Sequence, residues 1–244
     1  MHSKKSLVSR LDQRWYPNHP TNWDNVLFRN CILKWITPNS QVLDYGAGRG
    51  HVAHMNFKEI AGFVAGVDPD TAVFANPYLD EAKLLPLPSG TIDYPDNCFD
   101  VVFSDNVMEH ISDPEGTFRE IKRVLKPGGI FLAKTPSIWH YMPCIARATP
   151  NWFHKAVNRQ RGRQDEDTFP KHYRCNSAAS VRIWSDKVGL AVSRVDLVEG
   201  RPEYLRFNPL TYAVGLAYER LINTSSMFQR FRCVLIFELR KDGR

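Results

Sequence analysis

The apolar residues of this chain fall into short continuous runs that alternate with stretches of helical spacing. The continuous runs predict buried strands at residues 41–45, 63–67, 82–85, 99–104, 130–134, 190–198 and 233–239. Helical spacing is present at residues 24–36, 51–60, 113–125, 177–188 and 208–222. Because strands and helices alternate, we predict an α/β fold whose mostly parallel sheet has helices on both faces.

Capping residues mark the ends of two of these helices. Asp113 can cap the third helix, whose first turn tolerates Pro114, and the Lys-Pro-Gly-Gly stretch 126–129 ends it. Ser177 can cap the next helix, and Gly189 follows its last apolar residue. These signals place both helices between predicted strands.

The most informative stretch is 42–50, where the first strand ends in Asp44 and runs into Gly46, Gly48 and Gly50. Glycines permit a tight turn and let a ligand approach the backbone. We expect the helix at 51–60 to point its free N–H groups toward the same ligand. The stretch therefore predicts a site for a nucleoside cofactor.

Acidic residues end three of the predicted strands and restrict the choice of cofactor. Asp44, Asp68 and Asp105 should meet at one edge of a parallel sheet, where ligands bind. The glycine spacing lacks the third glycine of a dinucleotide fingerprint, because His51 stands there. Asp44 would also repel a pyrophosphate. A cofactor with positive charges and no phosphate, such as S-adenosylmethionine, fits this turn better.

Four segments, in order, resemble the motifs of one family. They are Val42 to Gly50, Gly66 to Asp68, the stretch from Tyr94 to Ile111 with Glu109-His110, and Leu125 to Gly129. The chain resembles a class I S-adenosylmethionine-dependent methyltransferase of the type 11 group. The resemblance implies a Rossmann-like seven-stranded sheet whose last strand is antiparallel.

The same resemblance implies a set of cofactor contacts. Gly46, Ala47 and Gly48 would line the methionine end of S-adenosylmethionine, Asp68 would bind the ribose, and Pro69 would pack near the adenine. The full predicted set of cofactor residues is Asp44, Gly46, Ala47, Gly48, Gly50, Asp68, Pro69, Ser104, Asp105 and Asn106. Many relatives have an Asp where this chain has Ser89-Gly90-Thr91, so the adenine contact differs here.

Composition and length indicate the cellular location and the domain organisation of the protein. The 244 residues carry a formal charge of +6, include no run of 18 apolar residues, and start without the apolar stretch of a signal peptide. We expect a cytoplasmic protein. The five cysteines are scattered without metal-ligand spacing, so we expect reduced thiols and no metal site. We divide the chain into an arm and helix at 1–38 and a methyltransferase domain at 39–244, with an insertion at 137–176.

The insertion is the expected acceptor side. Residues 139–163 contain five Lys or Arg, two His and four aromatic residues, but no acidic residue. We predict a helix from Thr149-Pro150, which could be a packed cap, an interfacial helix at the inner face of a membrane, or an RNA surface. A nucleic-acid partner is the least favoured, since no RNA-binding module is recognised. The apolar stretch 209–218 could add to an acceptor pocket or a dimer interface.

The reaction predicted from these features is methyl transfer to a small-molecule or lipid-linked acceptor, and oxygen methylation is favoured. A hydroxyl acceptor needs a base. The catalytic candidates are His110, His140, His172 and Tyr173, with Tyr141 as a further positioning group. In the N-terminal arm, residues 1–22, Trp15 or Tyr16 could close over the cofactor, or the arm could be poorly ordered.

Other classes of function stay open at this stage. The chain could bind S-adenosylmethionine as a regulatory protein without catalysis. It could also be an RNA methyltransferase or an NAD-dependent oxidoreductase.

Overall fold

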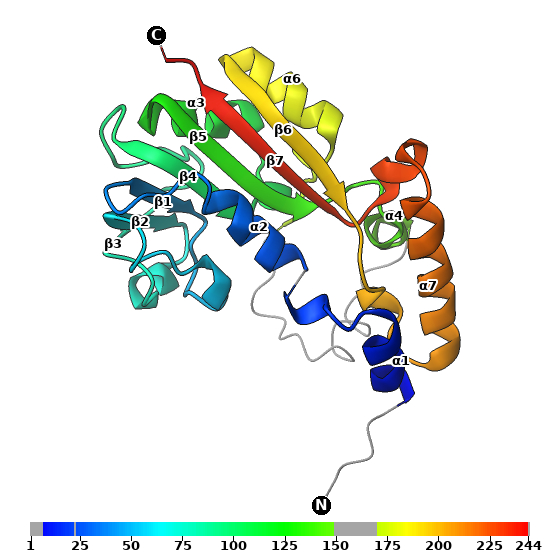
Figure 1. Ribbon diagram of the computed structural model, residues 1–244. Coiled ribbons are helices and arrows are strands. Elements are labelled where there is room, and N and C mark those ends of the chain that lie inside the picture. Colours follow the sequence, from blue (N-terminus) through cyan, green and yellow to red (C-terminus); the bar gives the residue numbers. More distant parts are fainter. Residues whose placement is uncertain (1–6, 22, 149–169, 244) are drawn as a thin grey trace, which may run out of the picture. The chain divides into compact units, whose positions relative to one another are not determined.

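The computed structural model describes residues 7–21, 23–148 and 170–243 (Figure 1). Contacts divide the described chain into two compact units. The helical unit combines the described residues of Met1–Asp24, Ser137–Phe169 and Leu197–Val234. The sheet unit combines Asn25–Pro136, Pro170–Asp196 and the described residues of Leu235–Arg244. The described ranges contain no helix long and apolar enough to cross a membrane.

Seven strands form one sheet in the order β3-β2-β1-β4-β5-β7-β6. The strands are β1 Gln41–Tyr45, β2 Phe63–Asp68, β3 Glu81–Leu84, β4 Phe99–Asp105, β5 Leu125–Pro136, β6 Leu190–Val198 and β7 Val234–Lys241. The pairs from β3 to β5 are parallel. The last strand, β7, runs opposite to its neighbours β5 and β6 (Figure 1). The predicted Rossmann-like sheet with an antiparallel last strand is therefore confirmed.

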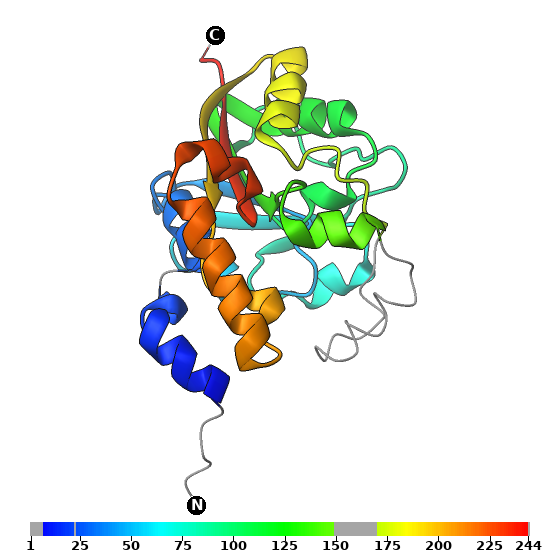
Figure 2. The ribbon, with the colours of Figure 1, turned by 90° about the vertical axis from the view of Figure 1, so that its right-hand side faces the viewer.

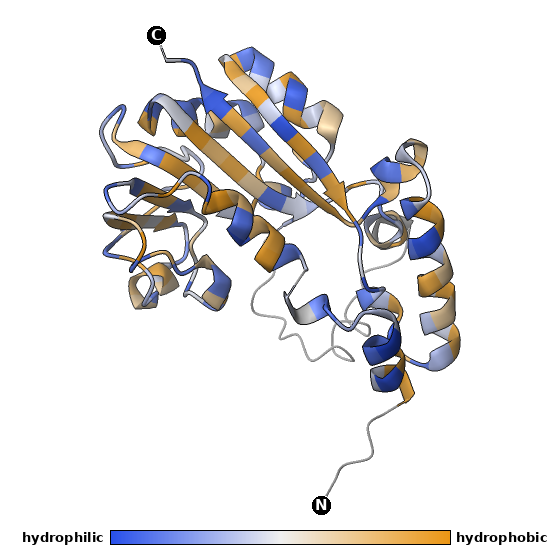
Figure 3. Cartoon of the chain, in the orientation of Figure 1, coloured by the Kyte–Doolittle hydropathy of each residue, from blue (hydrophilic) through white to orange (hydrophobic). Residues whose placement is uncertain are grey.

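The centre of the sheet is buried on both faces, as the continuous apolar runs predict. Val42, Val102 and Phe131 are fully buried in the adjacent strands β1, β4 and β5. Hydrophobic residues accordingly run along β5 (Figure 3). On one face, Phe118 of α3 packs edge-on against Phe131 and stacks on Phe237 of β7. These rings join the helix layer to the sheet.

The helices on that face begin and end at the predicted residues. Helix α3, Pro114–Val124, has Asp113 as its N-cap, whose carboxylate accepts a bond from the Gly116 N–H at 3.1 Å. Helix α6, Ala178–Val188, starts at a Ser177–Ser180 capping box and ends at Gly189, with φ +70°. The two helices lie side by side (Figure 2).

The predicted helix at 51–60 is wrong. Only a short 3-10 helix, η2 at Ala53–Met55, forms there. The buried residues of the stretch are Met55 and Phe57, which are two positions apart and could not share one helix face. Histidine, valine and asparagine are weak helix formers, and no side chain caps the N-terminus of η2. The glycine turn is therefore followed by irregular backbone, not by a helix N-terminus.

Two element boundaries also differ from the prediction. Helix α2, Asp24–Ile32, ends four residues early, and Trp35 beyond it donates its indole N–H to Glu238 at 3.1 Å. Strand β5 starts at Leu125, which pairs with Phe99 of β4, and the Lys-Pro-Gly-Gly stretch lies in an irregularity of the strand before pairing resumes between Ile130 and Val101. Both stretches contact partners distant in sequence.

The helical unit contains α1 Leu7–Trp15, α4 Tyr141–Ala148 and α7 Pro209–Asn223. The poorly ordered arm expected at 1–22 is wrong for residues 7–15, which are helical. Asp12 of α1 pairs with Arg201 at 3.2 Å and with Arg206 at 2.5 Å, so distant residues hold this helix. The helix predicted from Thr149-Pro150 lies outside the described residues.

Short 3-10 helices complete the described elements. They are η1 His19–Thr21, η2, η3 Thr71–Ala75, η4 Met108–His110, η6 Glu203–Leu205 and η7 Ser226–Phe231. Two of them, η3 and η4, directly follow strand ends of the sheet unit and shape the edge described next.

Candidate cofactor site

The glycine turn after β1 is fixed by the neighbouring strand. The N–H groups of Gly46 and Ala47 donate to the Val67 carbonyl at 2.8 and 3.2 Å. Gly46 has φ +83°, and an added Cβ would lie 2.2 Å from a methyl group of Val107. Gly50 has φ +75°, and its added Cβ would lie 2.5 Å from Oδ1 of Asn76. Both positions therefore require glycine for conformation and for space.

Asp68 and Asn76 hold the turn from the side of β2. The Asp68 carboxylate accepts bonds from the N–H of Gly48 at 2.9 Å and of Asp70 at 2.8 Å. The Asn76 amide donates to the carbonyls of Ala47 at 2.9 Å and Gly48 at 3.3 Å. The backbone of the turn is thus bonded from two directions, and this fixes the groups that face a ligand.

A cleft of about 370 Å³, measured out to open solvent, lies against this turn. It is lined by Asp44, Gly46, Ala47, Gly50, His51, Val52, Met55, Asn76, Tyr78 and Asp105. The lining combines an open backbone, two carboxylates and apolar side chains.

The cleft is electrostatically suited to a cation. Burial raises the pKa of Asp44 well above its ordinary value, and the nearby carboxylates of Asp105 and Asp68 raise it further. Burial also raises the pKa of Asp68. The bonds that the Asp70 and Gly48 N–H groups donate to its carboxylate lower this pKa, but by less. The negative charge of Asp105 is compensated by the buried Lys134 ammonium, which lies 2.9 Å from its Oδ1. A positively charged ligand would relieve the remaining repulsion.

The structure brings half of the predicted cofactor residues to this cleft. Asp44, Gly46, Ala47, Gly50 and Asp105 line it. Among the described residues, the lining does not include Gly48, Asp68, Pro69, Ser104 or Asn106.

Three of the residues outside the lining support the strand ends. Gly48 and Asp68 are bonded to each other. Asn106, with φ +56°, donates its side-chain amide to Asp105 at 2.8 Å. The other two do not face the cleft: Ser104 is fully buried and donates to the Tyr45 carbonyl at 2.9 Å, and Pro69 is exposed. Direct contacts of these five residues with a cofactor stay predictions.

Three of the catalytic candidates meet at Glu109. The backbone N–H groups of His172 and Tyr173 donate to the Glu109 carbonyl at 2.7 and 3.1 Å. His110 places Nε2 3.9 Å from Glu109 Oε1, and its Nδ1 lies 3.0 Å from the Pro170 carbonyl. The buried Glu109 carboxylate also accepts a bond from the Thr135 hydroxyl at 2.8 Å. Glu109 thus holds together segments from three parts of the sequence.

The fourth candidate, His140, belongs to the helical unit, as does Tyr141. Burial lowers the pKa of His140 to about 3, so its imidazole is neutral at physiological pH. Burial also raises the pKa of the neighbouring Tyr141 hydroxyl. Trp15 and Tyr16, predicted as contacts of a closing arm, belong to the same unit. The Tyr16 hydroxyl donates to Glu219 of α7 at 2.9 Å, and a role over the cofactor stays a prediction.

Sequence reasoning missed Asn76 and Tyr78 in the cleft. The only signal was the Asn-Pro pair at 76–77, which marks a turn without indicating its partner. The buried Glu109 was seen only as part of a motif. His51, Val52 and Met55 line the cleft although the predicted helix is missing.

The sheet order, the glycine turn and the acidic strand ends together define an α/β domain with a nucleoside-cofactor site. A family model described as a methyltransferase domain matches residues 43–133. An uncharacterized methyltransferase of Mycobacterium leprae is 30% identical over 215 residues, which cover 78% of this chain and 77% of that protein. The chain belongs to the class I S-adenosylmethionine-dependent methyltransferases, type 11 group.

Other comparisons show how much of each related protein this chain covers. A tRNA U34 carboxymethyltransferase of Saccharophagus degradans is 29% identical over 133 residues, covering 51% of this chain and 39% of that protein. The chain spans about half or less of the length of the first curated relatives that it matches. An S-adenosylmethionine-dependent methyltransferase structure from Mesorhizobium loti matches with a TM-score of 0.58 at 18% identity, over 89% of this chain and 97% of that one. This likeness concerns the fold alone.

Proposed function

We propose that this protein transfers the methyl group of S-adenosylmethionine to a hydroxyl of a small-molecule or lipid-linked acceptor, with His110 as general base. In this reaction the acceptor oxygen attacks the methyl carbon in line with the sulfur. The carbon–sulfur bond breaks and its electron pair stays on sulfur, while the base takes the hydroxyl proton. The residues of the cleft would hold the cofactor through its charges and its nucleoside.

The observation that carries the proposal is the bond between His110 and the Pro170 carbonyl. A carbonyl can only accept, so Nδ1 carries the proton of the neutral ring and Nε2 carries the lone pair. The Glu109 carboxylate, 3.9 Å from Nε2, would stabilise the imidazolium formed when the ring takes a proton. His110 follows Asp105, which lines the cleft, by five residues. These features suit a base for a hydroxyl acceptor.

Support for an apolar acceptor comes from α7. Leu210, Val214 and Leu221 are exposed on it at spacings of four and seven residues, which place them on one side. Hydrophobic residues along this helix are visible in Figure 3. Peripheral membrane contact through residues 139–163 remains part of the proposal, although most of that stretch lies outside the described residues.

An RNA acceptor is the second candidate, because one of the matching relatives is a tRNA carboxymethyltransferase. The RNA acceptor and the small-molecule or lipid-linked acceptor are distinguished by incubating the protein with labelled S-adenosylmethionine and three fractions of a lysate from the source organism. The fractions are an organic-solvent extract, polar small molecules and RNA. We expect label in one of the first two. Label in RNA alone would refute the proposed acceptor, and thermal stabilisation by the cofactor without label would indicate binding without catalysis.

The role of His110 is tested with His110→Gln on the labelled acceptor. We expect kcat to fall by about 10²- to 10⁴-fold, which is the usual contribution of a general base. Cofactor affinity should not change. His54→Gln, at an exposed histidine of the same unit, is the matched control and should keep wild-type kcat. A His110→Gln variant with wild-type kcat at all pH values would eliminate this residue as the base.

A further inference from the structure

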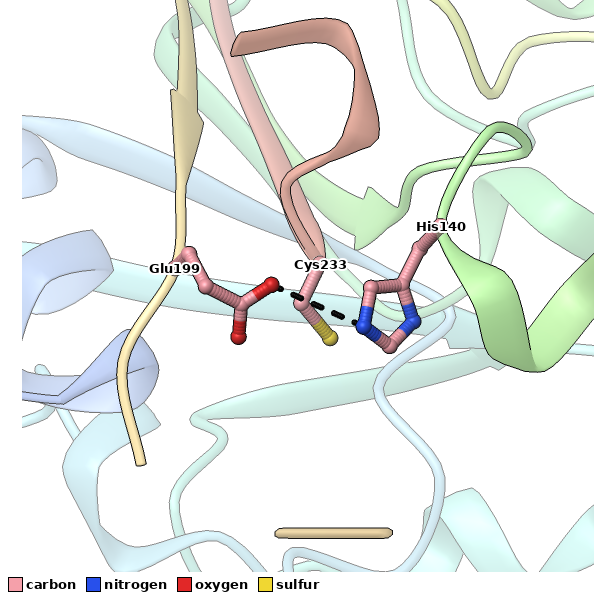
Figure 4. A group of neighbouring side chains, drawn as sticks. All are labelled: His140, Glu199 and Cys233. Atoms are coloured by element: carbon pink, nitrogen blue, oxygen red, sulfur yellow. Dashed lines mark ion pairs between the residues drawn. The ribbon is translucent and has the colours of Figure 1, made fainter. Parts of the chain in front are cut away.

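Three side chains that can bind a metal meet inside the helical unit. His140 lies just before α4, Glu199 just after β6 and Cys233 just before β7 (Figure 4). Their ligand atoms all lie within 4.8 Å of one another. His140 Nε2 is 3.5 Å from Glu199 Oε2, and the two side chains are 2% and 5% exposed. The nitrogen and oxygen ligands are thus shielded from water, and the sulfur of Cys233 is half-buried.

The backbone around these residues is fixed by contacts within the same unit. The Ser137 N–H donates to the Cys233 carbonyl at 2.8 Å, which joins the segment of His140 to that of Cys233. The Arg232 guanidinium donates to the Leu197 carbonyl at 3.0 Å, which joins the segments of Cys233 and Glu199. These bonds join the three segments to one another without any ligand.

The Glu199 carboxylate is divided between two environments. Its Oε1 accepts a bond from the Gly200 N–H at 3.2 Å. Its Oε2 is buried, lies 3.5 Å from His140 Nε2 and has no hydrogen bond among the described residues, while the carboxylate also accepts a backbone bond from Cys233. A buried carboxylate oxygen normally has a donor or a cation as partner. A cation between this oxygen and the His140 ring would supply such a partner.

Aromatic rings close the surroundings of the cluster. The His140 ring centroid lies 4.1 Å from that of Tyr141 and 5.8 Å from those of Tyr204 and Tyr218. The Tyr218 hydroxyl donates to the Phe231 carbonyl at 2.6 Å and so holds the chain two residues before Cys233. A charge inside such a wall must be compensated locally, because water cannot solvate it.

We propose that His140, Glu199 and Cys233 bind a zinc ion, with a fourth position open to water or another ligand. Zinc accepts imidazole nitrogen, carboxylate oxygen and thiolate sulfur together, and three protein ligands leave one tetrahedral position. A thiolate, a carboxylate, a neutral imidazole and a dication sum to zero charge, which suits a buried position. Magnesium and calcium prefer oxygen ligands and are disfavoured by the thiolate and the imidazole.

Zinc binding would change one contact of the histidine. Nδ1 of His140 accepts a bond from the Met142 N–H at 3.4 Å, which is long for a hydrogen bond. With zinc on Nε2, the neutral ring would carry its proton on Nδ1, which could no longer accept from the Met142 N–H, so this weak bond would be lost. The cost is small, and the Met142 amide becomes a reporter of binding.

The test measures zinc bound by the full chain. The protein is treated with a chelator under reducing conditions, titrated with zinc and analysed for bound metal after gel filtration. We expect about one zinc ion per chain for the wild type. Cys233→Ser should weaken zinc binding about 100-fold or more, since changes in the surrounding shell alone cost 10- to 100-fold. Cys144→Ser, at an exposed cysteine, is the matched control and should bind zinc normally.

Cobalt gives an independent readout, because thiolate-bound cobalt has a charge-transfer band in the near ultraviolet. The band should be present in the wild type and in Cys144→Ser and absent in Cys233→Ser. Thermal stabilisation by S-adenosylmethionine verifies that a variant is folded, and Glu199→Gln replaces Cys233→Ser if the latter does not fold. A wild type without bound zinc, or equal zinc binding by the wild type and by the folded Cys233→Ser or Glu199→Gln variant, would overturn the proposal.

Discussion

The buried carboxylate of Asp44 should destabilise the cofactor-free protein and hold the cofactor when it binds. Asp44 lines the cleft and its pKa is raised by burial, then by Asp105 and Asp68. The cofactor-free protein must therefore keep a poorly solvated charge near two others. Asp44→Asn removes the charge and keeps the shape. We expect this substitution to raise the melting temperature without ligand and to weaken S-adenosylmethionine binding.

The two effects have opposite signs and similar sizes. Removing an uncompensated buried charge is worth about 1–3 kcal/mol, and about 1 kcal/mol already shifts the melting temperature of a chain of this size by about 2–4 °C. A ligand at 100 times its dissociation constant stabilises the wild type by about 2.7 kcal/mol, or about 5–11 °C. If the lost interaction weakens binding about 100-fold, the same ligand concentration adds only about 0.4 kcal/mol.

Thermal melts with and without S-adenosylmethionine measure both effects. Asp93→Asn is the matched control, because the Asp93 side chain is 85% exposed, and it should change neither quantity. An Asp44→Asn variant that melts lower than the wild type without ligand would contradict the electrostatic argument. One that keeps the full shift with S-adenosylmethionine would remove Asp44 from the cofactor site.

The stabilising effect of this substitution should depend on pH. Between the ordinary pKa of 3.8 and the raised folded pKa, native Asp44 binds more proton than the unfolded chain does. The stability contributed by this group therefore falls as pH rises through that interval. The advantage of Asp44→Asn over the wild type should be small at pH 3.8 and grow above it, until Asp44 is fully ionised. Melts of both proteins across this range, in one buffer series, test the sign.

Three further substitutions test the support of the site and the fold. Asn76→Ala removes the bonds to Ala47 and Gly48, so S-adenosylmethionine affinity measured by calorimetry should fall about tenfold, or about 1.4 kcal/mol; unchanged affinity would refute the role of Asn76. Gly46→Ala should cost about 1–3 kcal/mol in denaturant unfolding, because its φ is +83° and Val107 occupies the space; a neutral result would mean that the turn can shift. Ser177→Ala removes the N-cap of α6 and should cost about 1 kcal/mol in the same assay with wild-type cofactor affinity; a loss of affinity would contradict a purely structural role.

The parts of the fold that could be predicted from sequence are those whose cause is local. Val42 and Leu43 are apolar, and the strand ends two residues later at Tyr45, directly before Gly46, so the strand and its turn follow from neighbouring residues. Asp113 and Ser177 mark helix starts because a cap acts within three residues. The stretch 51–60 misled because its apolar spacing resembles a helix, while burial of Met55 and Phe57 by the rest of the unit decides its shape.

The candidate site shows the same division between local and distant causes. Positive φ values at Gly46 and Gly50 depend on the turn itself, so the glycines could be predicted to lie at a ligand. Asn76 lines the cleft because η3 returns its side chain to the turn, and no residue near position 47 indicates that return. His140, Glu199 and Cys233 are separated by two long stretches of chain, and none has a neighbour with metal-ligand spacing. Local motifs therefore predict the cofactor turn but not the cluster. The three ligand types of the cluster come together only when the chain folds.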